Sequence, residues 1–427
     1  MPLIFRTILV IALGAGSLLT PRVCLAQAPR VKADQLHRVT TVVPFPRGLV
    51  IVDGQLYVLS RGRVREAGGV DAQIDDQAGT IFVVDPNVAG PASEYPINEN
   101  VRNNGEVFAA PTSPPFRLFD RSKKPATLDR HTDRPYCGLR YDPATQNFFV
   151  CAFSGIDKPD AGKEGRNFSK NLSDAVFRFD TRSKAWSVVE QHDPEAGGSY
   201  PHQDPVSGTP PHGWLNGPNN CLAVGHWLYV VSKDNSLLIR YDLRAIAKDP
   251  AAPAPPATWT LDHKIFLQGL GLQEYYGHSM LAYREGWLYL GYRTSSKIVR
   301  IKLDDANVPV QPMEAQLVAE FDAFDPKTRK SADLTDMAFG REGDLYVVTA
   351  QPAGIYRFTP DPARVFDGRT TAATIWADLA TLTGNPKMKS ENLLVDDAGR
   401  VFVTSGDAYN FQSGAGGVVW RIDPAAR

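Results

Sequence analysis

One hairpin pattern recurs six times along the chain, and this repeat constrains the fold more than any other feature. Each copy has a short apolar strand, a tight polar turn and a second strand that often contains Leu-Tyr-Val. Alternating apolar residues around Gly-bearing turns are signals of β-hairpins. The copies occupy residues 47–60, 137–153, 220–232, 279–292, 335–349 and 389–403.

A third strand follows every hairpin, and five of the six carry an arginine at the same place. These arginines are Arg178, Arg240, Arg300, Arg357 and Arg421. A weaker fourth strand follows in units two to five, at 186–191, 258–267, 315–321 and 374–379. The first unit offers only 93–97 as its fourth strand, and the sixth unit ends with the chain.

The apolar segment 37–45, ahead of the first hairpin, supplies the strand that the sixth unit lacks. Four-stranded units with periods of about 55 to 90 residues are typical of β-propellers. We therefore predict an all-β, six-bladed β-propeller with four-stranded blades, in which the N-terminal strand closes the ring and protects the sheet edges. A seventh blade within 98–134 is the alternative, although that segment has no hairpin pattern.

The N-terminus differs from the rest of the chain. Arg6 precedes a short apolar run and the sequence Ala26-Gln27-Ala28, which is the pattern of a secretory signal. The apolar run is too short for the roughly 20 residues of a membrane span, and an uncleaved anchor is the alternative. We expect a signal peptide at 1–28, a single propeller domain at 29–427, and a secreted or periplasmic protein without membrane insertion.

The charge balance excludes a general attraction to nucleic acid, because the formal net charge of the 427 residues is −1. Beyond the signal the chain contains three cysteines, Cys137, Cys151 and Cys221. Cys137 and Cys151 lie on adjacent predicted strands and can pair, but three buried free thiols fit the sequence as well.

The long irregular segments fall on one face of the predicted propeller, where the first strand of each blade begins. These segments are 61–78, 98–134, 154–174, 192–217 and 404–417. Binding and catalytic residues concentrate in long loops on rigid scaffolds. We therefore expect the functional site on this face.

The residues just before each first strand should surround the mouth of a central channel. They are Arg47, Tyr136-Cys137, Asn219-Asn220, His278-Ser279, Thr335-Asp336 and Glu391-Asn392. Carboxylate and amide oxygens suit a hard cation such as Ca²⁺, so Glu391, Asn220 and Asp336 form a candidate metal set, with Asn392 beside them. A set with His278 suits a softer metal. Backbone capping is the structural alternative for Asn and Asp.

The insertions add candidates for catalysis and substrate binding. His212 and His278 are candidate general bases, since a histidine near a carboxylate can activate water. Arg47 can clamp an anionic or hydroxylated substrate. The further candidates for substrate binding are Arg134, Trp214 and Tyr276.

The units "NCLAVGHWLYVVS…LLIRYDL" and "ENLLVDDAGRVFVTS…VVWRIDP" resemble six-bladed propellers of the NHL and SMP-30/gluconolactonase/paraoxonase type. The resemblance implies calcium-dependent lactonases and esterases that hold the metal at the mouths of the first strands. By this resemblance, Asn220 in "PNNCL" and Glu391-Asn392 in "SENLLVD" are similar to the residues that hold the metal in that family. Arg47 stands where the family has a glutamate.

Two functions follow as hypotheses. In the first, an exported, metal-dependent hydrolase opens a lactone or ester of a small sugar-like substrate, with a divalent cation, Ca²⁺, polarising the carbonyl. In the second, a non-enzymatic propeller binds an extracytoplasmic protein or glycan through Trp214, Tyr275, Tyr276 and Arg134, since aromatic and arginine side chains anchor such contacts.

Overall fold

The computed structural model describes most of the propeller repeats. The described residues are 30–61, 64–67, 71–74, 79–94, 97–110, 136–152, 175–191, 206–207, 215, 217–232, 237–248, 259–262, 278–292, 295–311, 313–321, 333–350, 352–368, 375–406 and 417–424. The predicted signal peptide lies outside them, so it stays a prediction. In the part of the chain that is described, no helix is long and apolar enough to cross a membrane.

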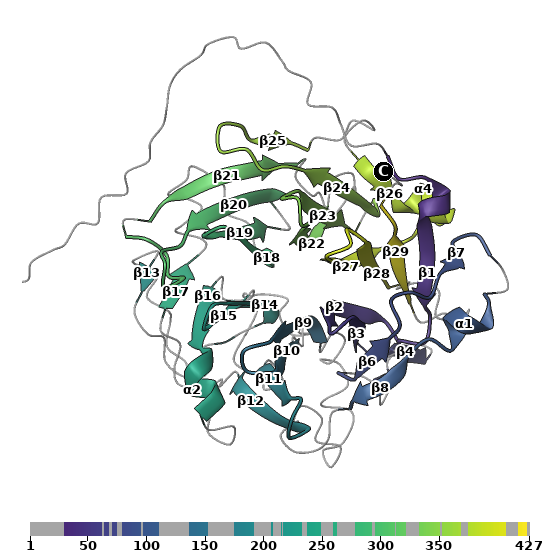
Figure 1. The fold of residues 1–427 in the computed structure, drawn as a ribbon, viewed down its shortest axis with the longest axis horizontal. Coiled ribbons are helices and arrows are strands. Elements are labelled where there is room, and N and C mark those ends of the chain that lie inside the picture. The colour runs from purple at the N-terminus through teal and green to yellow at the C-terminus, as the bar shows by residue number, and fades with distance from the viewer. Residues whose placement is uncertain are drawn as a thin grey trace, which may run out of the picture.

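Six small antiparallel sheets lie in a ring around a central axis, which confirms the predicted six-bladed propeller (Figure 1). Blade 1 consists of β2 (Pro46–Val52), β3 (Gln55–Ser60), β6 (Ile81–Val84) and β8 (Glu106–Ala109). Blade 2 consists of β9 (Tyr136–Asp142), β10 (Asn147–Ala152), β11 (Ala175–Asp180) and β12 (Ala185–Gln191). Blade 3 consists of β14 (Pro218–Val224), β15 (Trp227–Ser232), β16 (Leu237–Asp242) and β17 (Trp259–Asp262). Blade 4 consists of β18 (His278–Arg284), β19 (Trp287–Tyr292), β20 (Lys297–Lys302) and β21 (Ala315–Glu320). Blade 5 consists of β22 (Leu334–Phe339), β23 (Leu345–Thr349), β24 (Gly354–Phe358) and β26 (Ile375–Asp378). Blade 6 consists of β27 (Ser390–Val395), β28 (Val401–Ser405), β29 (Val418–Ile422) and β1 (Leu36–Thr40).

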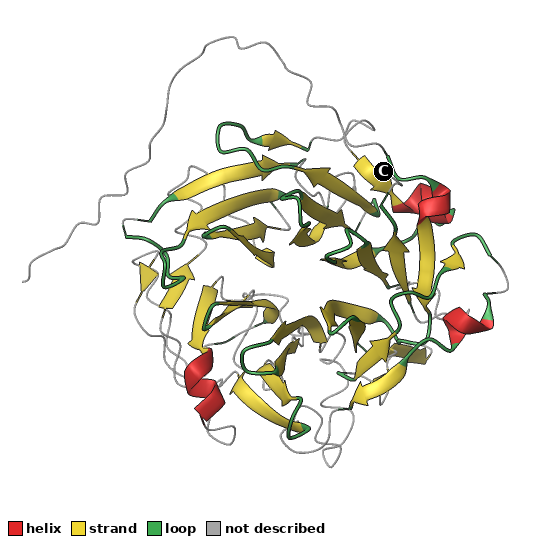
Figure 2. Cartoon of the chain, viewed as in Figure 1, coloured by secondary structure: helices red, strands yellow, loops and turns green. Residues whose placement is uncertain are grey.

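Short helices lie at the periphery of the ring, away from the innermost strands (Figure 2). They are η1 (Ala33–Gln35), α1 (Glu99–Arg102), α2 (Leu243–Lys248) and α4 (Leu379–Thr383). The second strands β10 and β15 are buried along their whole length. This is the burial expected of strands with neighbouring blades on both faces, and it explains their continuous apolar sequences.

The N-terminal strand β1 closes the ring, as predicted. It pairs antiparallel with β29, so that Leu36 lies opposite Ile422. Val39 of β1 is fully buried in a cluster that joins blade 6 to blade 1 through Leu49 and Phe402. The first and last strands of the domain therefore share one sheet and one core.

The outer strand of blade 1 is where the sequence-based assignment is wrong. Residues 93–97 do not form its fourth strand; β8, at Glu106–Ala109, pairs with β6 in that place. The chain first crosses to blade 6, where β7 (Gly90–Pro91) pairs with β1, and then returns through α1. This return runs through part of 98–134, which had been considered for a seventh blade.

Three blades carry a fifth strand of two residues at the outer edge. These strands are β13 (Val206–Ser207) on blade 3, β25 (Phe366–Asp367) on blade 4 and β7 on blade 6. One further hairpin, β4 (Val64–Ala67) with β5 (Asp71–Ile74), stands in the first long loop. A short added strand blunts a sheet edge that would otherwise offer unpaired backbone groups. Most of the other long loops lie outside the described residues, so the prediction of a functional face stays a prediction.

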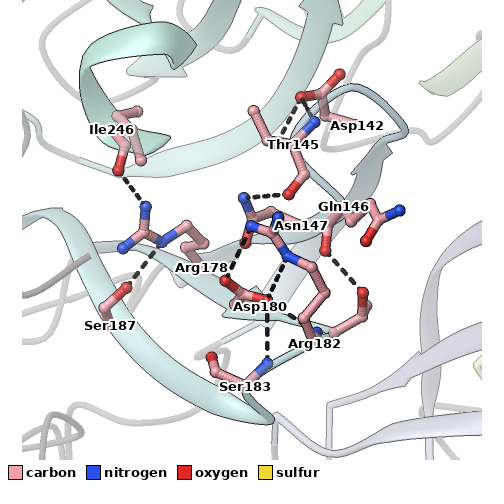
Figure 3. A network of polar contacts seen from close by, with 11 residues as sticks. Asp142, Thr145, Gln146, Asn147, Arg178, Asp180, Arg182, Ser183, Ser187 and Ile246 are labelled. Atoms are coloured by element: carbon pink, nitrogen blue, oxygen red, sulfur yellow. Dashed lines mark hydrogen bonds and ion pairs between the residues drawn. The ribbon is translucent and has the colours of Figure 1, made fainter. Parts of the chain in front are cut away.

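The repeated arginines of the third strands each lie opposite an aromatic residue of the second strand. The five pairs are Phe149–Arg178, Tyr229–Arg240, Tyr289–Arg300, Tyr346–Arg357 and Phe402–Arg421. Among the contacts between described residues, two of these arginines bond to a neighbouring blade. Arg178 donates to the carbonyl of Ile246 at 2.5 Å (Figure 3), and Arg421 donates to that of Pro86 at 2.7 Å. The repeat therefore ties blades together at their outer layers.

Ring closure by β1 predicts that Val39→Asp strongly destabilises the protein. The substitution removes a buried apolar side chain and places a charge between blades 6 and 1, so we expect the free energy of unfolding to fall by at least about 3 kcal/mol. The matched control is Val107→Asp, because Val107 is 55% exposed on β8. Urea unfolding should show a change of at most about 0.5 kcal/mol for the control. Equal effects of the two substitutions would contradict closure by β1.

Candidate functional site at the mouth of the central channel

The innermost strands of the six blades form a closed ring of neighbours, in the order β2, β9, β14, β18, β22 and β27. Their packing is close where β2, β9 and β14 meet. A Cβ atom on Gly48 would lie 2.7 Å from Cβ of Leu139, and one on Gly138 would lie 3.1 Å from Cα of Asn220. Gly48 also has a φ of +68°, which a side chain disfavours. Glycine at these positions lets the strands approach at the mouth.

Every innermost strand has an irregular register near its first residues, where the pairing skips one or two positions. The skipped residues are Gly48, Cys137, Asn219, Ser279, Thr335, and Glu391 with Asn392. A β-bulge bends a strand and changes the direction of its side chains, and bulges are frequent next to active sites. These six bulges bend the inner strands at the mouth, and outer strand pairs of the blades have bulges as well.

Asp336, on β22, is the centre of the polar contacts in the channel, and its side chain is fully buried. Its Oδ1 accepts from the backbone N–H of Met337 at 3.0 Å and from Nδ2 of Asn220 at 3.4 Å. Its Oδ2 accepts from the backbone N–H of Leu393 at 3.1 Å and from Nδ2 of Asn392 at 3.2 Å. One carboxylate thus joins blades 3, 5 and 6.

Arg140 reaches the same carboxylate from the opposite side of the ring. It belongs to β9, which lies three places from β22 in either direction around the six inner strands. Nη2 of Arg140 lies 3.7 Å from Oδ1 of Asp336. Burial raises the pKa of Asp336 above its ordinary value, although the Arg140 charge and the N–H donors oppose that shift. The guanidinium thus supplies the opposite charge across the channel.

A second ion pair lies beside this cluster. Arg47 on β2 donates from Nη1 to Oε2 of Glu391 on β27 at 2.5 Å, and both side chains are partly exposed, 17% and 10%. Two polar atoms here are buried without a hydrogen-bond partner among the described residues: Nε of Arg47, which is a donor, and Oδ1 of Asn392, which is an acceptor. A buried polar atom left unpaired costs about 1–3 kcal/mol, so each of these two atoms would gain from a hydrogen-bond partner.

The structure brings several predicted site residues together. Asn220, Asp336 and Asn392 form one cluster, and Glu391, next in sequence to Asn392, pairs with Arg47. His278 is the first residue of β18, but its side chain lies outside the described residues. The predicted residues that lie wholly outside the described part are His212, Arg134, Trp214 and Tyr276. Their roles therefore stay predictions.

The remaining cysteine prediction is also open. Cys151 is buried in β10, whereas the side chain of Cys137 is not among those described. Pairing between the two therefore stays a prediction.

Sequence reasoning missed Arg140. The signal was present, because "CGLRYD" places a charged residue inside an otherwise apolar innermost strand. Such a side chain must find a partner in the channel.

Among the side chains that the structure describes, the donor set at the mouth does not fit a resident calcium ion. Its acids are Asp336 and Glu391, and each already has a guanidinium partner. Oδ1 of Asn220 accepts from the backbone N–H of Cys221 at 2.9 Å. A divalent ion roughly 5 Å from a guanidinium would meet about 7 kcal/mol of repulsion at an effective dielectric constant of about 20. Across the described residues no group of three His, Cys, Asp or Glu side chains is placed to hold a metal.

Comparison with known proteins gives only distant structural matches. No protein-family model and no curated protein matches it. Similar solved structures include a putative oxidoreductase (glucose dehydrogenase) from Thermus thermophilus, with 14% identity, a TM-score of 0.46, and coverage of 90% of this chain and 98% of that chain. The calcium-binding protein regucalcin from Agrobacterium tumefaciens has 8% identity, a TM-score of 0.45, and coverage of 93% of this chain and 95% of that chain. A streptogramin B lyase has 13% identity, a TM-score of 0.41, and coverage of 90% of this chain and 96% of that chain.

The sheet topology of the chain itself shows that it is a six-bladed β-propeller. Identities of 8% to 14% and TM-scores below 0.5 carry no information on activity.

The contacts of Asp336 predict that Asp336→Ala destabilises the protein by about 3–5 kcal/mol, because it leaves the Arg140 guanidinium without its opposite charge and four N–H donors without their acceptor. Urea unfolding at neutral pH measures the loss. The matched control is Asp305→Ala, at an exposed position in the turn after β20, which should change the free energy of unfolding by no more than about 0.5 kcal/mol. Similar values for the two variants would show that Asp336 is not the centre of the cluster.

Proposed function

We propose that this propeller binds a small hydroxylated molecule at the mouth of its central channel and hydrolyses a lactone or ester bond in it. The observation that carries the proposal is the convergence of polar side chains from blades 1, 2, 3, 5 and 6 at the bulged ends of the inner strands. Polar groups that meet in one place on a rigid scaffold are typical of ligand sites.

The charges favour an uncharged ligand with several hydroxyl or carbonyl groups. Arg47 and Arg140 offset the two carboxylates, so the cluster has no net charge to neutralise an ion. A hydroxyl group both donates and accepts, and it matches the unpaired Nε of Arg47 and Oδ1 of Asn392. A sugar-like lactone or ester has these groups.

The partly exposed ion pair supplies the chemistry for hydrolysis. In the proposed reaction Glu391, whose carboxylate pairs with Arg47, accepts a proton from water as the water attacks the carbonyl carbon. The guanidinium of Arg47 then stabilises the oxyanion that forms. When the ring C–O bond breaks, the proton passes to the leaving oxygen and gives the free acid and a hydroxyl group.

The experiment measures hydrolysis of a six-membered sugar lactone and of an acyclic ester of the same acid. Calcium is present in excess, so that a metal requirement cannot hide the activity. We expect the Glu391→Gln variant to lose roughly 100-fold or more in kcat/KM, the range for a general base. Arg47→Ala should lose activity as well. Arg102→Ala, on the exposed helix α1, is the matched control and should retain it.

Calorimetry with the free acid and with an unreactive cyclic ether analogue separates binding from catalysis. Binding without turnover, lost in Arg47→Ala, would support the site but overturn the hydrolase. If the protein shows no binding and no turnover, both the proposed site and the proposed hydrolase are overturned.

The alternative, a propeller that binds a protein or glycan through Trp214, Tyr275, Tyr276 and Arg134, involves side chains outside the described residues.

A further inference from the structure

The channel contains two opposite-charge pairs in adjacent positions. The carboxylates of Asp336 and Glu391 come from neighbouring inner strands, β22 and β27, and their guanidinium partners come from β9 and β2. Amide groups of Asn220 and Asn392 complete the set. This composition of two acids and two amides is one that could surround a cation, yet two arginines are built into it.

We propose that Arg140 and Arg47 take the place of a resident cation in this channel, so that the acids and amides of the ring are held together by guanidinium groups and without a metal ion. The two arginines carry together the charge of one divalent ion. They provide it from the chain itself, and they do so independently of the activity proposed above.

The position of Arg140 supports this inference most directly. Its side chain crosses from β9 to reach a carboxylate on the opposite inner strand, and it is mostly buried, with 15% of the side chain exposed. Nη1 donates to the backbone carbonyl of Leu139 at 2.9 Å, so the guanidinium contacts its own strand as well as Asp336. A cation bound between Asp336 and the facing strand would have to displace this group.

The buried carboxylate explains why a positive charge is needed at all. Asp336 is fully buried, and an ionised carboxylate without a compensating charge is expensive to bury. Guanidinium stays protonated throughout the physiological range and donates several hydrogen bonds in a fixed plane, so it meets this need without depending on metal supply.

The test compares thermal unfolding in excess calcium and in excess EDTA, together with metal analysis of the purified protein. We expect the wild-type protein to contain no stoichiometric divalent metal and to have the same Tm in both conditions. Arg140→Gln should lower the Tm by roughly 5 °C in EDTA, because it leaves the Asp336 charge without its partner. Calcium should then raise the Tm of the Arg140→Gln variant, or of the double variant that combines Arg47→Gln with Arg140→Gln, by about 3 °C or more.

Arg140→Lys is the matched control, because it keeps the positive charge at the same place. Its Tm should not respond to calcium. Asp336→Asn added to the double variant should abolish the calcium response, since it removes one of the two acids.

Three results would overturn the inference. They are stoichiometric divalent metal in the wild-type protein, a wild-type Tm that rises with calcium, and a folded double variant that ignores calcium. The wild-type measurements keep the inference testable even where the double variant does not fold. Failure of the hydrolysis assay leaves these measurements unaffected, so the two proposals are tested separately.

Discussion

Antiparallel pairing between β1 and β29 is the interaction on which the rest of the structure depends. It brings residues 36–40 beside the last strand of the chain and turns six separate sheets into a closed ring. Closure fixes how many inner strands surround the axis and therefore which of them face each other. Arg140 on β9 meets Asp336 on β22 because a six-membered ring sets these strands opposite one another. With a different number of blades, the same residues would not lie across the axis.

Contacts at the periphery of the ring hold neighbouring blades together, and this keeps the geometry of the mouth fixed. Arginines of the third strands lie opposite aromatic residues of the second strands, and Arg178 and Arg421 bond to carbonyls of the next blade. Trp227 donates from Nε1 to the carbonyl of Ala306 on the next blade at 3.0 Å. Such contacts combine apolar burial with specific hydrogen bonds, which favours a single arrangement of neighbouring sheets.

Much of this architecture could be predicted from the sequence because propeller blades repeat. The hairpins, the third strands and the closing strand follow from period and alternation, and the meeting of Asn220 with Asp336 follows from their equivalent places in different blades. Blade 1 could not be assigned in this way, because its chain visits blade 6 before forming β8. The charge of Arg140 within an inner strand indicated that it needs a partner, but not that this partner is Asp336. Arg140 acts through the length of its side chain across the channel, and no local pattern encodes that distance.

The charges at the mouth show why a shared fold is weak guidance to chemistry. A ring of acids and amides at strand ends suggests a cation, and the same ring with Arg47 and Arg140 inserted is already neutral. The bulges and the closed ring are features of the backbone, whereas the positive charge beside the buried carboxylate of Asp336 comes from the side chain of Arg140. Side chains at two positions therefore decide whether the acids of this mouth are already compensated, because buried electrostatic interactions are strong and leave little unbalanced charge.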